Sequence, residues 1–348
     1  MQLSHHIKQF LPRYWAWLLF AMLASLIVVT LISLSFGATP TSFKELVLWL
    51  MGESDLQSHI IIQQLRLPRA LLALCIGSLL ATCGAISQGL FRNPLADPSL
   101  IGVSAGASAG ASIAIVFLAG AQWSLFSLSL VSMGAFVGGI LSVYLVYQIA
   151  TNTSGTSVST MLLAGIAIAF IAGGVSNALE FFADNDMLRR MSLWRMGGLD
   201  SANTPRVIIA ATVAAGIFCL MPRYYSPLNA LLLGESEARH LGIDVNRTKR
   251  HLVILVAAGV GTSVALAGTI AFIGLVVPHM VRLVIGPNHR FLLPISAFMG
   301  ALLLLIADAF ARTVIAPTEI PVGLVSALLG APIFISLLRK RHHYGLQE

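Results

Sequence analysis

The 348-residue chain has few charged residues: Asp, Glu, Lys and Arg make up only 10% of it, whereas soluble domains contain about 25%. Hydrophobic residues make up 57%, and the mean hydropathy is +0.87. This composition excludes an ordinary soluble protein and predicts a single all-α, polytopic membrane domain over residues 1–348. The net charge of +7 does not indicate nucleic-acid binding, because the basic residues lie near the ends of apolar segments.

Motifs for nucleotide and metal chemistry are missing from the sequence. It has no G-x-x-x-x-G-K-[ST] and no Gly-Lys dipeptide, so it cannot bind ATP phosphates with a P-loop. It also has no H-E-x-x-H and no C-x-x-C, and we interpret Cys75, Cys83 and Cys219 as small residues of apolar segments. We therefore expect no metal and no cofactor on this chain, and no enzymatic activity of its own.

The apolar segments predict ten transmembrane helices. The first, 15–36, follows Lys8 and Arg13 and is about as long as a full span, so we interpret it as an uncleaved helix rather than a signal peptide. Segment 252–285 is too long for one helix, and Gly268, Gly274 and Pro278 divide it into a full span and a short one. The other segments are 68–90, 100–120, 124–149, 158–182, 206–221, 291–311 and 320–338.

An even number of spans predicts that both termini lie in the cytoplasm. The cytoplasmic side then holds 13 of the 21 Lys and Arg residues, including the run Arg339 to Arg341. Nine spans would place that run outside, against the positive-inside rule.

Three arginines are predicted at the outer ends of helices: Arg66, Arg69 and Arg312. Their rigid guanidinium forks suit carboxylates, so we interpret them as a docking surface for acidic residues of an external protein. The alternative, that they extend to lipid headgroups, stays open.

Two carboxylates fall within apolar segments, Asp308 and Glu180. Such residues are candidates for ion coupling. Asp308, however, precedes Arg312 by four residues, which places both on one helix face. We therefore predict structural ion pairing rather than a coupling-ion pathway.

The sequence Gly102-Val-Ser-Ala-Gly106 matches the G-x-S-x-G pattern of serine hydrolases. It continues as a run of small residues inside an apolar segment, which is typical of close helix packing in membranes. We assign Gly102, Ser104, Gly106 and Gly110 to helix packing or to the transport pathway. An intramembrane hydrolase that uses Ser104 is the alternative.

A polar segment at about 223–250 interrupts the apolar pattern and predicts a loop with a short amphipathic element. We interpret it as a docking site for a soluble partner. We expect that partner to be an ATPase subunit, because the nucleotide site has to lie on another polypeptide if transport is driven by ATP. The residues assigned to this coupling role are Leu233, Gly234, Glu235, Ala238, Arg239, Leu241 and Gly242.

Several stretches together resemble one family: Leu65–Arg69, Arg92–Ser104, Leu233–Gly242, Phe272–His279, and Glu319–Gly323 with Gly330–Pro332. Over nearly its full length the chain resembles the FecCD-type permeases of bacterial ABC importers for haem, ferric siderophores and cobalamin. The resemblance implies a BtuC-like, ten-helix subunit of the inner membrane that pairs with a second permease copy. It also implies two ATPase subunits, which hold ATP and Mg²⁺, and a periplasmic binding protein that docks on the three arginines.

The cargo is expected to be haem, because Thr160–Ile168, Ala183–Arg189 with Trp194, and Ala311–Glu319 resemble haem permeases. The run Glu180-Phe181-Phe182 departs from that pattern. A ferric siderophore or cobalamin is the alternative cargo, and an ion-coupled secondary transporter is the remote alternative function.

Overall fold

The computed structural model describes residues 14–37, 39, 41–118, 124–125, 128–153 and 155–344, without the side chains of 124–125, 128 and 337–344. Lys8 and Arg13, both chain ends and the side chains of Arg339 to Arg341 lie outside this description. The predicted cytoplasmic position of the termini depends partly on those residues.

Within the described residues, seven helices are long and apolar enough to cross a membrane, and three shorter apolar helices bring the bundle to ten. The long helices are α2 (Trp15–Ser35), α5 (Leu67–Leu90, continuous with a segment from Leu56), α7 (Leu130–Ala150), α8 (Val158–Phe182), α10 (Thr204–Leu233), α12 (Val245–Ala267) and α14 (His289–Ala311). The shorter apolar stretches are α6 (Val103–Phe117), α13 (Ile273–Ile285) and residues Val322–Ser336 of α15 (Val322–Tyr344). The predicted ten-helix membrane fold is confirmed.

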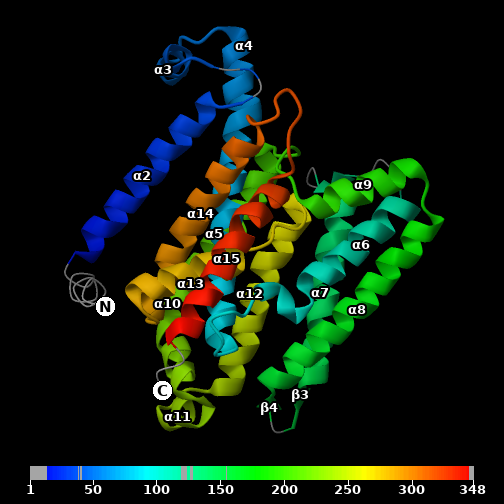
Figure 1. The fold of residues 1–348 in the computed structure, drawn as a ribbon, viewed down its shortest axis with the longest axis vertical. Coiled ribbons are helices and arrows are strands. Elements are labelled where there is room, and N and C mark those ends of the chain that lie inside the picture. The colour runs from blue at the N-terminus through cyan, green and yellow to red at the C-terminus, as the bar shows by residue number, and fades with distance from the viewer. Residues whose placement is uncertain are drawn as a thin grey trace.

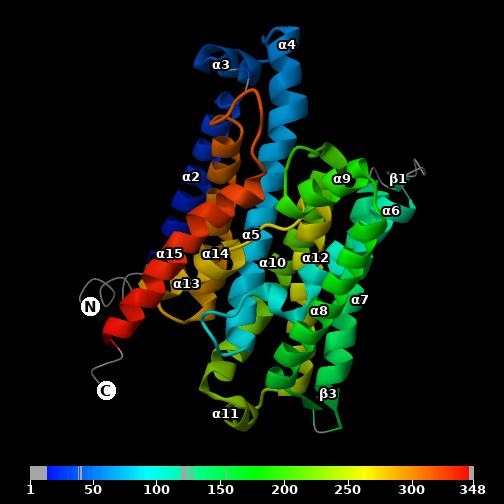
Figure 2. The same ribbon diagram turned by 45° about the vertical axis from the view of Figure 1, so that its right-hand side comes forward.

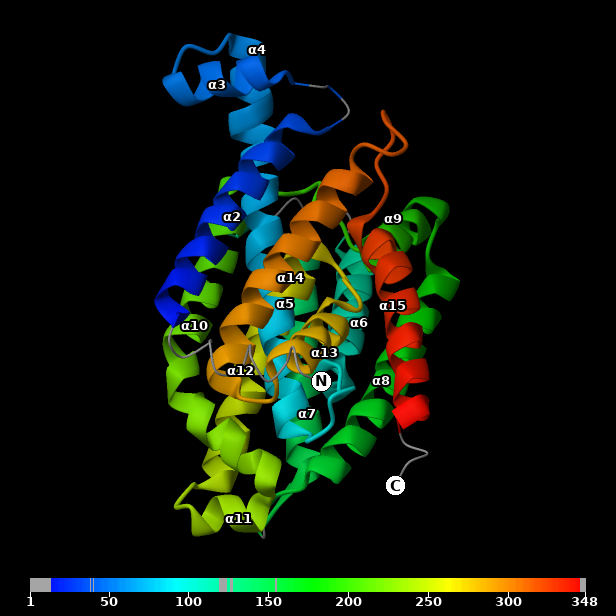
Figure 3. The same cartoon turned by 60° about the vertical axis from the view of Figure 1, so that its left-hand side comes forward.

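The central helix of the bundle is α5, which contacts α10, α12, α13 and α14 (Figure 1). Its packing against α14 is close: a Cβ on Gly77 would lie 2.3 Å from the carbonyl oxygen of Gly300. Small residues allow helix backbones to approach in this way. By contrast α2 is mostly exposed and lies at the edge of the bundle (Figures 2 and 3).

Several predicted helix boundaries are wrong; α12, for example, begins at Val245 rather than at residue 252. The sixth span was expected to end at residue 221, but α10 continues through Pro222 and Pro227 to Leu233. Proline costs a helix one hydrogen bond and some steric strain, and packing of α10 against α5, α12 and α14 compensates for this. The fourth span was expected from residue 124, where the short hairpin β1 (Ser124–Leu125) and β2 (Leu128–Ser129) precedes α7.

The division of 252–285 into two helices is confirmed. The break falls at residues 268–272, between α12 and α13, and Gly268 has a φ of +67°. Gly274 and Pro278, which were also expected to interrupt the segment, lie inside α13. Pro278 is the sixth residue of α13 and therefore removes the hydrogen bond that its N–H would donate to the Gly274 carbonyl, and packing of α13 against α5 and α14 compensates for this loss.

Shorter elements mark the two ends of the bundle (Figure 1). At one end, called here the coupling end, lie α11 (Glu235–His240) and the hairpin β3 (Thr151–Asn152) and β4 (Gly155–Thr156). The opposite end carries α3 (Phe43–Met51), α4 (Leu56–His59), which is followed by a π-helical stretch η1 (Ile60–Arg66), and α9 (Asn185–Met196). The 3₁₀ turn η2 (Pro98–Ile101) precedes α6. The hydrophobicity pattern did not predict α3, α4 or α9, because they are short and partly polar.

Candidate functional site

The coupling end carries α11, which two glycines delimit. Gly234 (φ +119°) separates α11 from α10, and Gly242 (φ +82°) ends the turn that follows it. Each of these positive φ angles is a backbone conformation that favours glycine. Ala238, which belongs to α11, is fully buried, so this face of the helix is held against the bundle.

Two leucines flank α11 and point outward. Leu233 is 68% exposed and Leu241 is 63% exposed. Glu235 and Arg239 lie one turn apart on the same helix, with 4.0 Å between their charged groups. The combination of exposed apolar side chains and charges at the end of a bundle is suited to binding a soluble protein.

The predicted loop of residues 223–250 is mostly helical. Residues 223–233 belong to α10 and residues 245–250 to α12. Only 234–244 separate these two helices, and α11 occupies most of that stretch. The predicted coupling element is therefore compact and continuous with two membrane helices.

At the opposite end, the structure brings Arg69 and Arg312 together around one carboxylate. Asp308, which is fully buried, lies 2.8 Å from Arg69 Nε through Oδ1 and 3.0 Å from Arg312 Nε through Oδ2. Arg69 Nη1 also lies 2.6 Å from Glu319 Oε2. The predicted Asp308–Arg312 pair is confirmed, and Glu180 likewise pairs with Arg195 of α9.

Arg66 lies at the same end and binds the linker between α2 and α3. Its Nη1 donates to the Leu34 carbonyl at 2.6 Å and to Thr41 Oγ1 at 2.7 Å, and its Nη2 donates to the Thr39 carbonyl. This side chain therefore fastens the α2–α3 linker to the helix that continues into α5.

All three arginines are buried: Arg66 is 5% exposed, Arg69 9% and Arg312 3%. Acceptors of their own chain surround each of these guanidinium groups. Burial lowers the pKa of Arg312, while the Asp308 carboxylate acts in the opposite direction; an arginine nevertheless keeps its charge at neutral pH. Docking on these residues stays a prediction, and the most exposed carboxylate of the cluster is Glu319, whose side chain is 38% exposed.

The small-residue run from Gly102 to Gly110 lies where α6 packs on α7. A Cβ on Gly106 would lie 2.4 Å from the carbonyl oxygen of Gly138, and one on Gly110 would lie 2.0 Å from that of Gly134. Gly102 has a φ of +80°, and its carbonyl accepts a hydrogen bond from Ser142 Oγ at 2.8 Å. In this arrangement the run serves close packing of two helix backbones.

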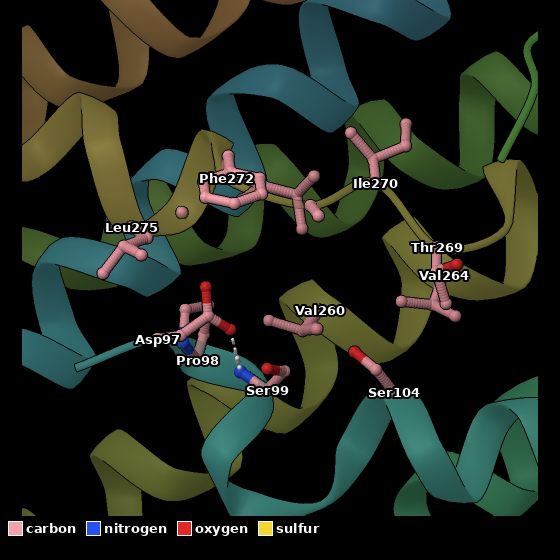
Figure 4. A pocket seen from close by; sticks show the side chains of 13 residues that line it. Asp97, Pro98, Ser99, Ser104, Val260, Val264, Thr269, Ile270, Phe272 and Leu275 are labelled. Carbon is pink, nitrogen blue, oxygen red and sulfur yellow. Dashed lines mark hydrogen bonds between the residues drawn. The ribbon is translucent and has the colours of Figure 1, made fainter. Parts of the chain in front are cut away.

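Ser104 lines a cavity of about 320 Å³ between α5, α6, α12 and the start of α13 (Figure 4). Asp97 also lines it and accepts a hydrogen bond from the Ser99 backbone at 2.8 Å, so its carboxylate caps η2. Most of the remaining lining is apolar, including Val260 and Phe272. No histidine is found among the described residues of this lining, so nothing here provides Ser104 with the base that a serine hydrolase requires.

The described part of the chain contains no group of three or more His, Cys, Asp or Glu residues placed to hold a metal ion. Sequence reasoning missed two residues of these sites. Glu319 lies within the stretch Glu319–Gly323 but was assigned no role, and Lys249 was not predicted to belong to any site. Lys249 is in fact 1% exposed and lies 2.6 Å from Glu235 of α11.

Comparison with known proteins agrees with this architecture. The profile of the FecCD transport family matches residues 25–340. The chain is 41% identical over 320 residues to the hemin transport system permease protein HmuU of Yersinia pestis. This match covers 92% of this chain and 94% of the relative. It is also 41% identical over 286 residues to the cobalamin import system permease protein BtuC of Halobacterium salinarum, covering 82% of this chain and 74% of the relative. A solved structure described as an inward-facing conformation of a metal-chelate type ABC transporter superposes with a TM-score of 0.82 at 30% identity, covering 93% of this chain and 99% of the other.

Proposed function

The chain belongs to the FecCD transport family, and from this membership we propose that it is the membrane-spanning permease subunit of an ATP-binding-cassette importer. The observation that carries the proposal is the compact coupling element, with exposed Leu233 and Leu241 on either side of α11, at the end of a ten-helix bundle. The sequence has no P-loop, so in this proposal ATP is hydrolysed by a separate ATPase chain.

We propose that the coupling end faces the cytoplasm and meets two ATPase subunits, and that the opposite end faces the periplasm and meets a binding protein. The permease would pair with a second copy of itself in the bacterial inner membrane. This orientation agrees with the excess of Lys and Arg assigned to the cytoplasmic side. Family membership supports the assembly.

Haem is the proposed cargo. Its support is the 41% identity to the haemin permease over 92% of this chain. Cobalamin remains the second candidate, because the cobalamin permease is 41% identical as well, over 82% of the chain. A ferric siderophore is a third, in keeping with the metal-chelate transporter that shares the fold.

In the proposed mechanism the pathway opens alternately to the two sides. The binding protein delivers cargo at the end where Arg66, Arg69 and Arg312 lie. Nucleotide binding by the ATPase subunits then displaces α11, and the helices attached to it shift relative to the central helix α5. The pathway would hold its cargo only transiently, so it needs no dedicated haem ligands.

The test is reconstitution of the permease in lipid with its candidate ATPase and binding protein. ATP hydrolysis and uptake are measured with haem, a ferric siderophore and cobalamin in turn. The proposal expects ATP-dependent uptake with one of these cargoes, and haem in particular. Uptake that ignores ATP and collapses with the ion gradient would instead establish a secondary transporter.

A further inference from the structure

A buried ammonium group connects the coupling element to a second part of the bundle. Lys249 lies in the second turn of α12 and is 1% exposed. Its Nζ lies 2.6 Å from Glu235 Oε1 and donates to the carbonyl oxygen of Thr156 at 2.6 Å. A buried charge is costly unless it is paired, and here one nitrogen has partners on two other elements.

These two partners have different roles in the fold. Glu235 is the first residue of α11. Thr156 ends β4, and the next residue, Ser157, is the N-cap of α8. Lys249 therefore contacts both the coupling element and the backbone that leads directly into α8.

A second contact holds the hairpin on α12. Gly155 has a φ of +115°, and a Cβ at this position would lie 2.4 Å from Asn246 Oδ1, in the first turn of α12. The hairpin and α12 thus also fit closely beside the Lys249 contact.

The helix that follows β4 packs on the bundle with only one face. It contacts α6, α7 and η2, while Leu163, Phe170 and Ile171 on its other face are 69%, 78% and 63% exposed. A shift applied at the first residue of such a helix tilts it as a unit, because its backbone hydrogen bonds make it stiff.

We propose that Lys249 is a positioning residue that transmits displacement of α11 to the start of α8 through Glu235 and the Thr156 carbonyl. This inference rests on the proposed function, in which an ATPase displaces α11. It assigns a specific contact to the step between nucleotide binding and movement of the membrane helices. The ATPase need not touch Lys249, which is buried.

The first test is Lys249→Met in the reconstituted importer, with Arg250→Met as the matched control because Arg250 is exposed on the same helix. The measured quantity is cargo taken up per ATP hydrolysed. Lys249→Met is expected to lower this ratio about tenfold while ATP hydrolysis persists, within the range typical of coupling between sites. Arg250→Met is expected to keep the wild-type ratio.

A second pair of variants covers the case in which Lys249→Met does not fold. Glu235→Gln keeps the side-chain size but weakens the ion pair, and the control Glu53→Gln removes an exposed charge from the opposite end of the bundle. Only Glu235→Gln is expected to lower uptake per ATP. A wild-type ratio in each well-folded variant would overturn the inference alone, whereas wild-type permease without ATP-dependent uptake would overturn the proposed function.

A distance measurement separates transmission from simple stability. Spin labels are placed at exposed positions Glu237 of α11 and Ser159 of α8, after replacement of the three native cysteines. In the wild type, the distance between the labels is expected to stay constant between nucleotide-free and ATP-bound complexes, because the two elements move together. In Lys249→Met the distance is expected to change with nucleotide, and an unchanged distance in that variant would refute the inference.

Discussion

Arg69 and Asp308 form an ion pair that joins the central helix α5 to α14, with 2.8 Å between Arg69 Nε and Asp308 Oδ1. The two residues are 239 positions apart in the sequence. Arg312 lies 3.0 Å from the other oxygen of the same carboxylate. The buried Asp308 carboxylate thus forms ion pairs with two of the arginines that were predicted to dock a binding protein.

We expect Asp308→Asn to destabilise the protein strongly. Loss of the shared countercharge leaves Arg69 and Arg312 buried with less compensation, and breaking a buried pair costs about 3–5 kcal/mol. The measurement is the thermal unfolding temperature in detergent. Glu319→Gln is the control, because its more exposed pair with Arg69 is expected to contribute about 1 kcal/mol or less. Equal unfolding temperatures for the two variants would contradict this account.

We expect Glu319→Gln to accelerate association with an acidic binding protein. The variant leaves Arg69 with one carboxylate fewer near the surface, which strengthens the positive potential there. The association rate is measured at several salt concentrations, and the difference from wild type should shrink as salt screens it. Glu237→Gln, at the coupling end, is the control. If Glu319→Gln associates at the wild-type rate in low salt, docking on these arginines is wrong.

We expect Gly110→Val to disrupt the contact between α6 and α7. A Cβ at this position would lie 2.0 Å from the Gly134 carbonyl oxygen, so the helices must separate. Overpacking of this kind costs about 1–3 kcal/mol or more. The matched control is Gly173→Val on α8, where a Cβ would meet no atom within 4 Å. The unfolding temperature should fall only for the first variant, and a similar fall for both would show that packing is not the cause.

We expect the double variant Leu233→Ser, Leu241→Ser to weaken binding of the ATPase about tenfold or more, the effect of losing roughly 1.4 kcal/mol at an interface. Both side chains are more than half exposed beside α11. Affinity is measured with purified permease and ATPase in nanodiscs. Leu50→Ser, which removes a leucine exposed by 58% at the opposite end, should bind normally. Wild-type affinity of the double variant would mean that the ATPase docks elsewhere.

We expect Ser104→Ala to leave transport unchanged. Ser104 lines a cavity whose described residues include no histidine base. The measurement is ATP-dependent uptake by the reconstituted importer. Loss of all activity in a folded Ser104→Ala variant would instead favour the intramembrane hydrolase.

Local sequence was sufficient for the membrane fold and for one ion pair. The apolar segments predicted ten helices because the bilayer sets the length of each span, independently of what the helix packs against. Asp308 and Arg312 were predicted to pair because residues four apart lie on one face of a helix. The glycine run 102–110 predicted close packing for an equally local reason.

The remainder depended on contacts between distant segments. Pro222 and Pro227 mark a helix end by local rules, and packing of α10 on its neighbours overrides them. The pairing of Arg69 with Asp308, the burial of Arg66 and the contact of Lys249 with Thr156 each join residues that are far apart along the chain. The sequence by itself determined that this is a membrane protein of ten helices with a polar segment near residues 223–250, because composition and periodicity are local properties. Only the tertiary structure decided which charges are buried and which elements they connect, because burial depends on how the helices pack.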